Sequence, residues 1–317
     1  MKHCFILNPA AGKGAGALTL REKIEECAKR RGCDAEIYLT AGIGDATEYI
    51  RRRVAAEPDE SFRFYACGGD GTLCETILAV MRLDSHIRKR VSVGVIPKGT
   101  GNDFVSNFEK KELFCDIAAQ IEGTHHDIDL LRCNDLYSVN MINIGFDCHV
   151  VCKKEKFDKK KWLPRKLAYI FSLLVTLVKK PTVTLERSDD SCERKKKGLL
   201  LTTLANGAFC GGGFRSNPKA ALDDGNIDCI EVNNVSRTKF LSLVGDYKKG
   251  KHLGEKFKNI VEHFKCKTAD MYFDEETPVS VDGEIIRTRE IHVSVYQKAL
   301  TILVPKGVKP ISASSAE

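Results

Sequence analysis

The sequence predicts an α/β domain with a mainly parallel sheet, followed by a C-terminal antiparallel β-sandwich domain. The chain has 317 residues, a length that suits two domains better than one. Over the first hundred residues, apolar runs of strand length alternate with amphipathic segments of helix length. This alternation is typical of parallel strands with helices on the sheet faces. After about Asp127, turns separate the strand-like segments instead, which indicates antiparallel pairing.

The first domain is expected to span residues 1–126. In chain order its elements are strand Phe5–Leu7, helix Ala17–Arg31, strand Glu36–Thr40, helix Asp45–Ala56, strand Phe62–Cys67, helix Thr72–Met81 and strand Val91–Ile96. The helices are assigned where apolar residues recur on one face among charged ones. Sheets of this kind bind their ligands at the carboxyl ends of the strands.

The second domain is expected to span residues 127–297. Its predicted strands are Tyr137–Ile144, Thr182–Glu186, Leu199–Ala205, Ile227–Val232, Pro278–Val281 and Ile291–Val295. A helix is expected within Lys239–Gly250. The last apolar run, Ala299–Val304, lies in a tail of residues 298–317 that could return to the first domain.

Composition and charge exclude several classes of protein. The longest apolar stretch, Leu167–Val178, has twelve residues, whereas a bilayer-spanning helix needs about 20. The N-terminus lacks the features of a signal peptide, so we expect a cytoplasmic chain whose 13 cysteines are reduced. Their spacing gives no metal-binding signature.

The net charge of +7 is concentrated in one segment. Lys153–Lys180 holds ten Lys or Arg residues against two acids, together with four aromatic residues that include Trp162. Such a segment is typical of an anionic membrane surface, and it predicts peripheral attachment to the inner face of the membrane. The alternative is a solvated charged loop followed by an ordinary buried helix. Nucleic acid is a third candidate that no other feature supports.

Glycine-rich turns follow three of the four strands of the first domain. The first turn, Asn8–Gly14, does not match the Walker pattern and is weak evidence for phosphate binding when taken alone. The second, Gly68–Thr72, places the carboxylate of Asp70 among three glycines at the start of a helix. The alternative for Asp70 is a plain helix cap. The third turn, Pro97–Phe104, again combines two glycines with a hydroxyl group. Three such turns on one sheet edge predict a nucleotide site.

With these turns in place, the chain resembles the diacylglycerol kinase and sphingosine kinase superfamily, and specifically its soluble bacterial lipid kinases. The three turns carry the resemblance together with Asn143–Asp147, Asp223–Gly225 and Asp282–Glu284, in the same order. The Gly-Gly-Asp-Gly element is shared with NAD kinases and phosphofructokinases, whereas the run Gly99–Phe104 favours the lipid kinases. The resemblance implies an ATP site in a cleft between the two domains.

The resemblance also assigns site residues by position. Those implied to contact ATP are Asn8, Pro9, Ala10, Ala11, Gly12, Thr40, Gly68, Gly69, Asp70, Gly71, Thr72 and Thr100. It further implies a structural Mg²⁺ ion on the Asp224 side chain, with backbone carbonyls near Ala221 and Asn226. A plain hairpin turn is the alternative for Asp223–Gly225.

The implied reaction transfers the γ-phosphoryl group of ATP to the hydroxyl of diacylglycerol, giving phosphatidic acid, or to a related lipid. The resemblance makes Glu284 the general base while Asp70 organises Mg-ATP, and the reverse assignment stays open. Solvated acids in a hairpin are the alternative for Asp282–Glu284. Other acceptors, such as a sphingoid base, another lipid or NAD, and a catalytically silent lipid-binding protein also stay open. A homodimer is considered, although no residue identifies an interface.

Overall fold

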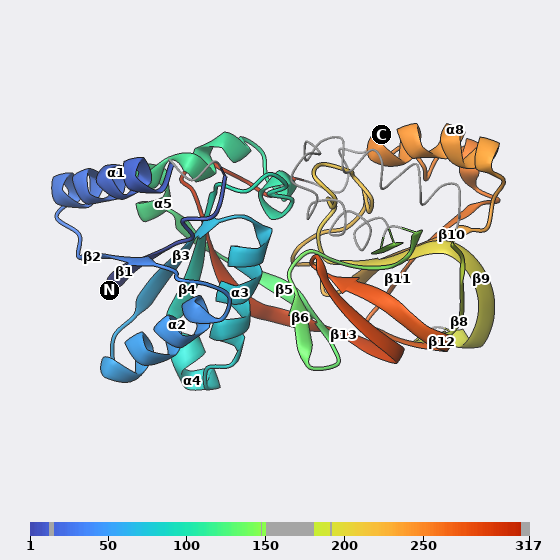
Figure 1. Ribbon diagram of the computed structural model, residues 1–317, viewed down its shortest axis with the longest axis horizontal. Coiled ribbons are helices and arrows are strands. Elements are labelled where there is room, and N and C mark those ends of the chain that lie inside the picture. Colours follow the sequence, from blue (N-terminus) through green and yellow to red (C-terminus); the bar gives the residue numbers. More distant parts are fainter. Residues whose placement is uncertain (13–15, 147, 150–180, 191, 312–317) are drawn as a thin grey trace. The chain divides into compact units, whose positions relative to one another are not determined.

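The computed structural model describes residues 1–12, 16–146, 148–149, 181–190 and 192–311 (Figure 1). The predicted membrane segment Lys153–Lys180 and the first-turn Lys13 lie outside these ranges. The chain divides into two compact units. The first comprises Met1–Leu130, Gly211–Gly213 and Gln297–Ser312, and the second comprises Leu131–Cys210 and Phe214–Tyr296. The boundaries expected between the two domains were residues 126 and 298. Nothing in the sequence pattern indicated that Gly211–Gly213 belongs to the first unit.

The first unit is built on a parallel sheet. Its strands are β1 (Lys2–Leu7), β2 (Ala35–Leu39), β3 (Phe62–Gly68) and β4 (Val91–Pro97), in the order β4-β3-β1-β2. At the far side of β4 lies the last part of β13 (Glu284–Val304), where Ile302 pairs in parallel with Val93. Strand β5 (Thr124–Cys133) begins in this unit and pairs with β13. The predicted parallel α/β architecture is confirmed.

Helices cover both faces of this sheet. Helices α1 (Gly16–Arg31) and α5 (Ile117–Ile121) lie on one face, and α2 (Asp45–Ala56), α3 (Asp70–Met81) and α4 (Ser85–Arg88) lie on the other (Figure 1). Two short 3-10 helices follow β4, at Phe104–Asn107 and Lys111–Cys115. Helix α1 buries Leu20, Ile24 and Ala28, which are spaced four residues apart and therefore share one face. A half-buried carboxylate joins α3 to α2, because Glu75 accepts the N–H groups of Ala46 and Thr47 at the start of α2.

The second unit is an antiparallel β domain. Its strands are β6 (Leu136–Ser138), β7 (Met141–Gly145), β8 (Val183–Asp189), β9 (Cys192–Ala205), β10 (Ile227–Asn233), β11 (Val261–Cys266), β12 (Thr268–Val281) and the first half of β13. They pair antiparallel in the order β11-β10-β9-β7-β12-β13, and β8 pairs with both β9 and β12. A helix, α8 (Arg237–Lys248), and the 3-10 turn Glu255–Phe257 follow β10. The predicted antiparallel domain is confirmed.

Two apolar clusters fill the second unit. One gathers inward-facing residues of β7 to β13, including Ile142, Leu185 and Met271. The other lies beneath α8 and joins Phe240 and Tyr247 to Val232 of β10. Within the described ranges, no helix is both long and apolar enough to span a membrane.

The prediction of a single strand over Tyr137–Ile144 was wrong. The structure divides this segment into β6 and β7, because residues 139–141 turn their N–H groups toward one side chain. The Asp282 carboxylate accepts hydrogen bonds from Val139 (2.7 Å), Asn140 (3.2 Å) and Met141 (2.8 Å). A carboxylate 141 residues away in sequence, which no local pattern reveals, therefore interrupts the strand.

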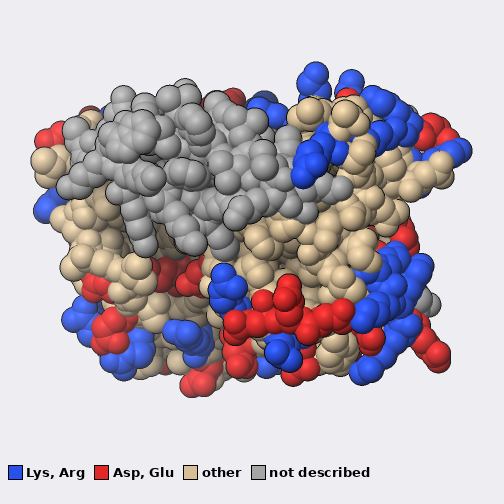
Figure 2. Space-filling view, turned by 45° about the vertical axis from the view of Figure 1, so that its right-hand side comes forward, with Lys and Arg blue, Asp and Glu red and all other residues tan. Residues whose placement is uncertain are grey.

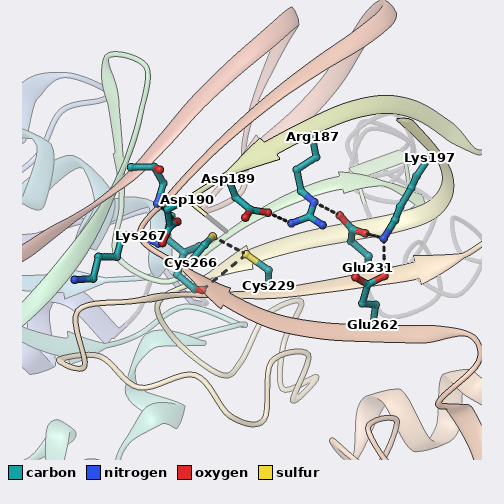
Figure 3. Close-up of polar contacts among 11 residues, drawn as sticks. Arg187, Asp189, Asp190, Lys197, Cys229, Glu231, Glu262, Cys266 and Lys267 are labelled. Carbon is teal, nitrogen blue, oxygen red and sulfur yellow. Dashed lines mark hydrogen bonds and ion pairs between the residues drawn. The ribbon is translucent and has the colours of Figure 1, made fainter. Parts of the chain in front are cut away.

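An ionic network that is buried except at Glu262 crosses β8 to β11 (Figure 3). The guanidinium of Arg187 pairs with Asp189 and lies 2.9 Å from Glu231, and it stacks on the Phe264 ring at 3.9 Å. Lys197 bridges Glu231 and Glu262, each at 2.5 Å. A buried charge is costly unless it is paired, so a shift in the register of β8, β9 or β10 would leave Arg187 or Glu231 buried without its partner. The neighbouring thiols of Cys229 and Cys266 are free, with their sulfur atoms 3.6 Å apart.

One buried histidine makes the first unit sensitive to acid. Burial, followed by the nearby Arg63 charge, lowers the pKa of His3 from 6.5 to about 4, and its Nδ1 hydrogen-bonds to the Tyr65 hydroxyl. The unfolded chain therefore binds more protons than the folded chain between pH 6.5 and 4, so stability is lost as the pH falls through this window. We expect the loss attributable to His3 to approach about 3 kcal/mol.

Urea unfolding of the wild type and of His3→Gln at pH 7 and pH 4.5 measures this contribution. The variant keeps a partner for Tyr65 but cannot titrate, so its stability should fall less with acid. His125→Gln is the control, because His125 is exposed. Equal acid losses in all three proteins would contradict the assignment.

Candidate nucleotide site

Three glycine-rich turns lie at one edge of the parallel sheet. They follow β1, β3 and β4, whose carboxyl ends are in register, with Leu7 beside Cys67 and Gly68 beside Pro97. Parallel strands end at the same edge, so the turns predicted to form the site are brought together as expected.

The first and second turns are joined through Asn8. Its side-chain nitrogen donates to the Thr72 hydroxyl at 3.1 Å, and its side-chain oxygen accepts the N–H of Ala10 at 2.9 Å. Thr40 joins the same edge, since its N–H donates to the Leu7 carbonyl at 2.9 Å. Asn8 thus closes its own turn and fixes that turn against the start of α3.

The second and third turns touch through their backbones. The Gly68 carbonyl accepts the N–H groups of Lys98 (2.7 Å) and Gly99 (3.2 Å). A Cβ atom placed on Gly99 would lie 2.5 Å from the Gly69 Cα, which is closer than any side chain could come. Glycine is therefore required at this crossing because two main chains meet there without room for a side chain.

Asp70 locks the third turn from the start of α3. Its two carboxylate oxygens accept the N–H groups of Asn102 at 2.7 Å and Asp103 at 2.9 Å. The capping residue of α3 is Gly69, and no side chain caps it. The alternative of Asp70 as a plain helix cap was therefore wrong, because its carboxylate points across to the neighbouring turn.

Asp103 holds the glycine segment of the first unit, a role that the sequence analysis missed. Its carboxylate accepts hydrogen bonds from Gly212 (3.0 Å) and Gly213 (2.9 Å). Burial, helped by the nearby Asp70 charge, raises the pKa of Asp103, and the two N–H donors oppose the rise. The acidic residue after Gly-Thr-Gly-Asn was visible in the sequence, but its partners lie more than a hundred residues away.

The remaining predicted nucleotide contacts lie in the same turns. Gly12 has a positive φ of 68°, and a Cβ atom there would lie 3.0 Å from the Lys98 carbonyl oxygen. Pro9 and Ala11 complete the first turn, and Thr100 lies between the two glycines of the third. The Gly69 carbonyl accepts the N–H groups of Thr72 and Leu73. The N–H groups of Asp70 and Gly71 come before these bonds, and the first N–H groups of a helix have no acceptor within the helix. This leaves the Asp70–Gly71 end of α3 suited to an anion.

Glu284 begins β13 directly after a clamped turn in the second unit. Asp282 and Gly283 form the turn with positive φ angles of 47° and 94°, and Val281 pairs with Glu284. Besides its three N–H partners, the Asp282 carboxylate accepts the Ser138 hydroxyl at 2.8 Å. Burial raises the pKa of Asp282, although these donors counteract it. The turn is therefore fixed, and it presents Glu284 exposed, with no ionic partner among the described side chains.

At the predicted magnesium site, the Asp224 carboxylate is paired with a cation of the protein in this structure. One carboxylate oxygen lies 2.5 Å from the Lys265 ammonium, and the other accepts the N–H of Asn226 at 3.0 Å. The Asn226 side chain in turn donates to the Asp224 carbonyl. The described ranges hold no group of three or more Asp, Glu, His or Cys side chains placed to bind a metal ion, so backbone carbonyls near Ala221 and Asn226 would have to complete the site. Lys265 already neutralises the one carboxylate.

This rim can bind a chain of phosphates. Clustered glycines let main-chain N–H groups approach phosphate oxygens, and the start of α3 adds a favourable partial charge. Asp70 and Asn8 fix the turns relative to one another, so the site is organised before any ligand arrives. Such preorganisation is what phosphoryl transfer requires of a protein.

Comparisons with known proteins identify the family of both domains. Residues 2–133 match the diacylglycerol kinase catalytic domain, and residues 140–304 match the YegS C-terminal NAD kinase beta sandwich-like domain. Among curated relatives, the diacylglycerol kinase of Mycobacterium tuberculosis is 26% identical over 95% of this chain and 94% of its own. The "Probable lipid kinase YegS-like" of Shewanella frigidimarina is 24% identical over 93% and 92%.

A solved structure shows the same fold. The crystal structure of a diacylglycerol kinase from Bacillus anthracis superposes with a TM-score of 0.72 at 22% identity, covering 96% of this chain and 97% of that one.

Enlarging Gly99 should separate the turns. We expect Gly99→Ala to weaken Mg-ATP binding at least about tenfold, because its Cβ atom would displace the Gly69 backbone. Gly42→Ala is the matched control, since nothing lies within 4 Å of its added Cβ atom. Calorimetric titration of both variants measures the effect. A folded Gly99→Ala protein that binds ATP like the wild type would show that the crossing is not needed.

The ion pair at Asp224 predicts that magnesium alone does not stabilise the protein. The unfolding temperature without nucleotide should be the same in Mg²⁺ and in a chelator, because a ligand stabilises only a protein to which it binds. Lys265→Met removes the competing cation, so that variant should gain stability on adding Mg²⁺. A clear rise for the wild type in Mg²⁺ would contradict this prediction.

Proposed function

Because the chain belongs to the family that joins a diacylglycerol kinase catalytic domain to a YegS C-terminal domain, we propose that it transfers the γ-phosphoryl group of ATP to the hydroxyl of diacylglycerol or a related lipid. The observation that carries the proposal is the fixed rim of three turns. Asn8 ties the first turn to the second, and Asp70 ties the second to the third.

In this proposal the turns hold the ATP phosphates. Their N–H groups bind the phosphate oxygens, and a magnesium ion accompanying ATP supplies further charge neutralisation when bound. The proposed contacts are those of the sequence analysis, Asn8–Gly12, Thr40, Gly68–Thr72 and Thr100. The contacts of Asn8, Asp70 and the Gly68 carbonyl hold these turns together.

Glu284 is the better candidate for the general base. A base must reach the attacking hydroxyl with an available carboxylate oxygen. Both oxygens of Asp70 already accept main-chain N–H groups, which supports a positioning role for Asp70. Glu284 is exposed, and the clamped turn of Asp282 holds it at a fixed point of the second unit. It would take the proton as the lipid oxygen attacks the γ-phosphorus and ADP leaves.

Two other classes of phosphoryl acceptor are distinguished from diacylglycerol by an assay with labelled ATP. NAD is one of these acceptors, because the second domain is similar to a NAD kinase beta sandwich. A sphingoid base is the other. An assay with labelled ATP over short-chain diacylglycerol, sphingosine, ceramide and NAD separates them, and we expect labelled phosphatidic acid. Transfer to NAD alone would replace the lipid proposal, and no transfer to any acceptor would leave a silent binding protein.

Removing the proposed base should abolish turnover without abolishing nucleotide binding. We expect Glu284→Gln to lower kcat by about 10²–10⁴-fold while the Kd for ATP stays unchanged. Glu290→Gln, which neutralises another exposed acid of β13, is the control and should keep full activity. A loss below tenfold in Glu284→Gln would reject Glu284 as the base.

A further inference from the structure

The second unit carries a cationic surface on α8 and the loop after it. Residues 237–258 hold seven Lys or Arg residues and two acids. Lys248, Lys249 and Lys251 are all exposed at the C-terminal end of the helix. Figure 2 shows Lys and Arg side chains gathered at the upper right, over the helix. We call Arg237, Leu241, Lys248, Lys249 and Lys251 the α8 cationic face.

This face is held rigidly from below. Phe240, Leu243 and Tyr247 recur every three to four residues and pack into the apolar cluster above β10. The opposite side of the helix therefore points outward. Arg237, Leu241 and Lys248 share one edge of it, because they are spaced by four and seven residues. The Lys248 ammonium is placed over the Phe214 ring at 5.5 Å.

The three lysines of this face, Lys248, Lys249 and Lys251, have no carboxylate partner among the described residues. The two acids of the segment are engaged elsewhere, since Asp246 pairs with Lys256 at 3.3 Å and Glu255 pairs with Lys258 at 2.7 Å. A lysine in the last turn complements the helix dipole, but this accounts for Lys248 alone.

One apolar side chain lies among the basic residues on this edge of α8. Leu241 is 57% exposed, although it lies between Arg237 and Lys248 on the same side of the helix. Basic residues around an outward apolar residue match an interface in which the ammonium groups meet anionic headgroups and the leucine enters the acyl boundary. A soluble polyanion would use the charges but would gain nothing from Leu241.

We propose that the α8 cationic face docks the protein on an anionic lipid bilayer. The inference rests on the proposed lipid kinase function, because an enzyme acting on a bilayer lipid must meet that surface. The face is built entirely from described residues of α8 and the loop after it, and it includes none of Lys153–Lys180. Each basic residue near an anionic membrane strengthens binding roughly fivefold, so three together act strongly.

Vesicle sedimentation of the full chain tests the proposal. The vesicles are phosphatidylcholine alone or with about 30% phosphatidylglycerol, at low salt and at about 0.5 M salt. We expect binding only to the anionic vesicles at low salt. Lys248→Gln/Lys249→Gln/Lys251→Gln should weaken it at least about tenfold. Leu241→Ser should weaken it without changing the salt dependence.

Matched controls separate this surface from net charge and from catalysis. Lys23→Gln/Lys29→Gln/Arg30→Gln removes three exposed charges from α1 and should bind vesicles like the wild type. All variants should phosphorylate a dispersed short-chain diacylglycerol equally. Equal vesicle binding by the α8 variant and the wild type, or binding to duplex RNA but not to vesicles, overturns the proposal. Vesicle binding without phosphorylation of any lipid overturns the proposed function and leaves the docking surface standing.

Discussion

The structure depends most on the Asp70 carboxylate, which reaches from the start of α3 to two N–H groups of the neighbouring turn. A buried N–H group without an acceptor is costly, so Asn102 and Asp103 are held where Asp70 places them. Asn102 then adopts a positive φ of 54° and closes its turn by bonding Gly99 in both directions. The close approach of Gly69 and Gly99 follows, and with it the shared rim of three turns.

Much of the first unit could be predicted from the sequence, because the glycine-rich turns of the proposed site lie directly at the ends of regular strands. Strand and helix periodicity located six of the seven predicted elements of the first unit to within two residues, since parallel α/β units bury regular faces. The first strand begins three residues before its predicted start, and β5 was not predicted. The turns were visible as glycines at strand ends. The pattern did not give the contacts between turns. Asn8 and Thr72 are 64 residues apart, so only the fold reveals that they bond.

The second unit was harder to predict, for two physical reasons. Charged residues concealed the start of β9, where Lys197 is a strand residue because Glu231 and Glu262 neutralise it. Long-range bonding also divided an expected strand, since Asp282 takes the N–H groups of residues 139–141. The same hydrogen bonds of Asp282 fix the turn before Glu284. The interaction that the sequence pattern did not reveal therefore positions a residue of the proposed site. Lys265 likewise bonds Asp224 across 41 residues, which the motif alone could not indicate.

The central claim is that three separate turns act as one phosphate-binding surface. Amide hydrogen exchange with and without a non-hydrolysable Mg-ATP analogue tests it most directly, because exchange reports on each turn separately. We expect the ligand to slow exchange together in residues 8–12, 68–72 and 99–103. Protection confined to one turn, or found only outside all three, would contradict it.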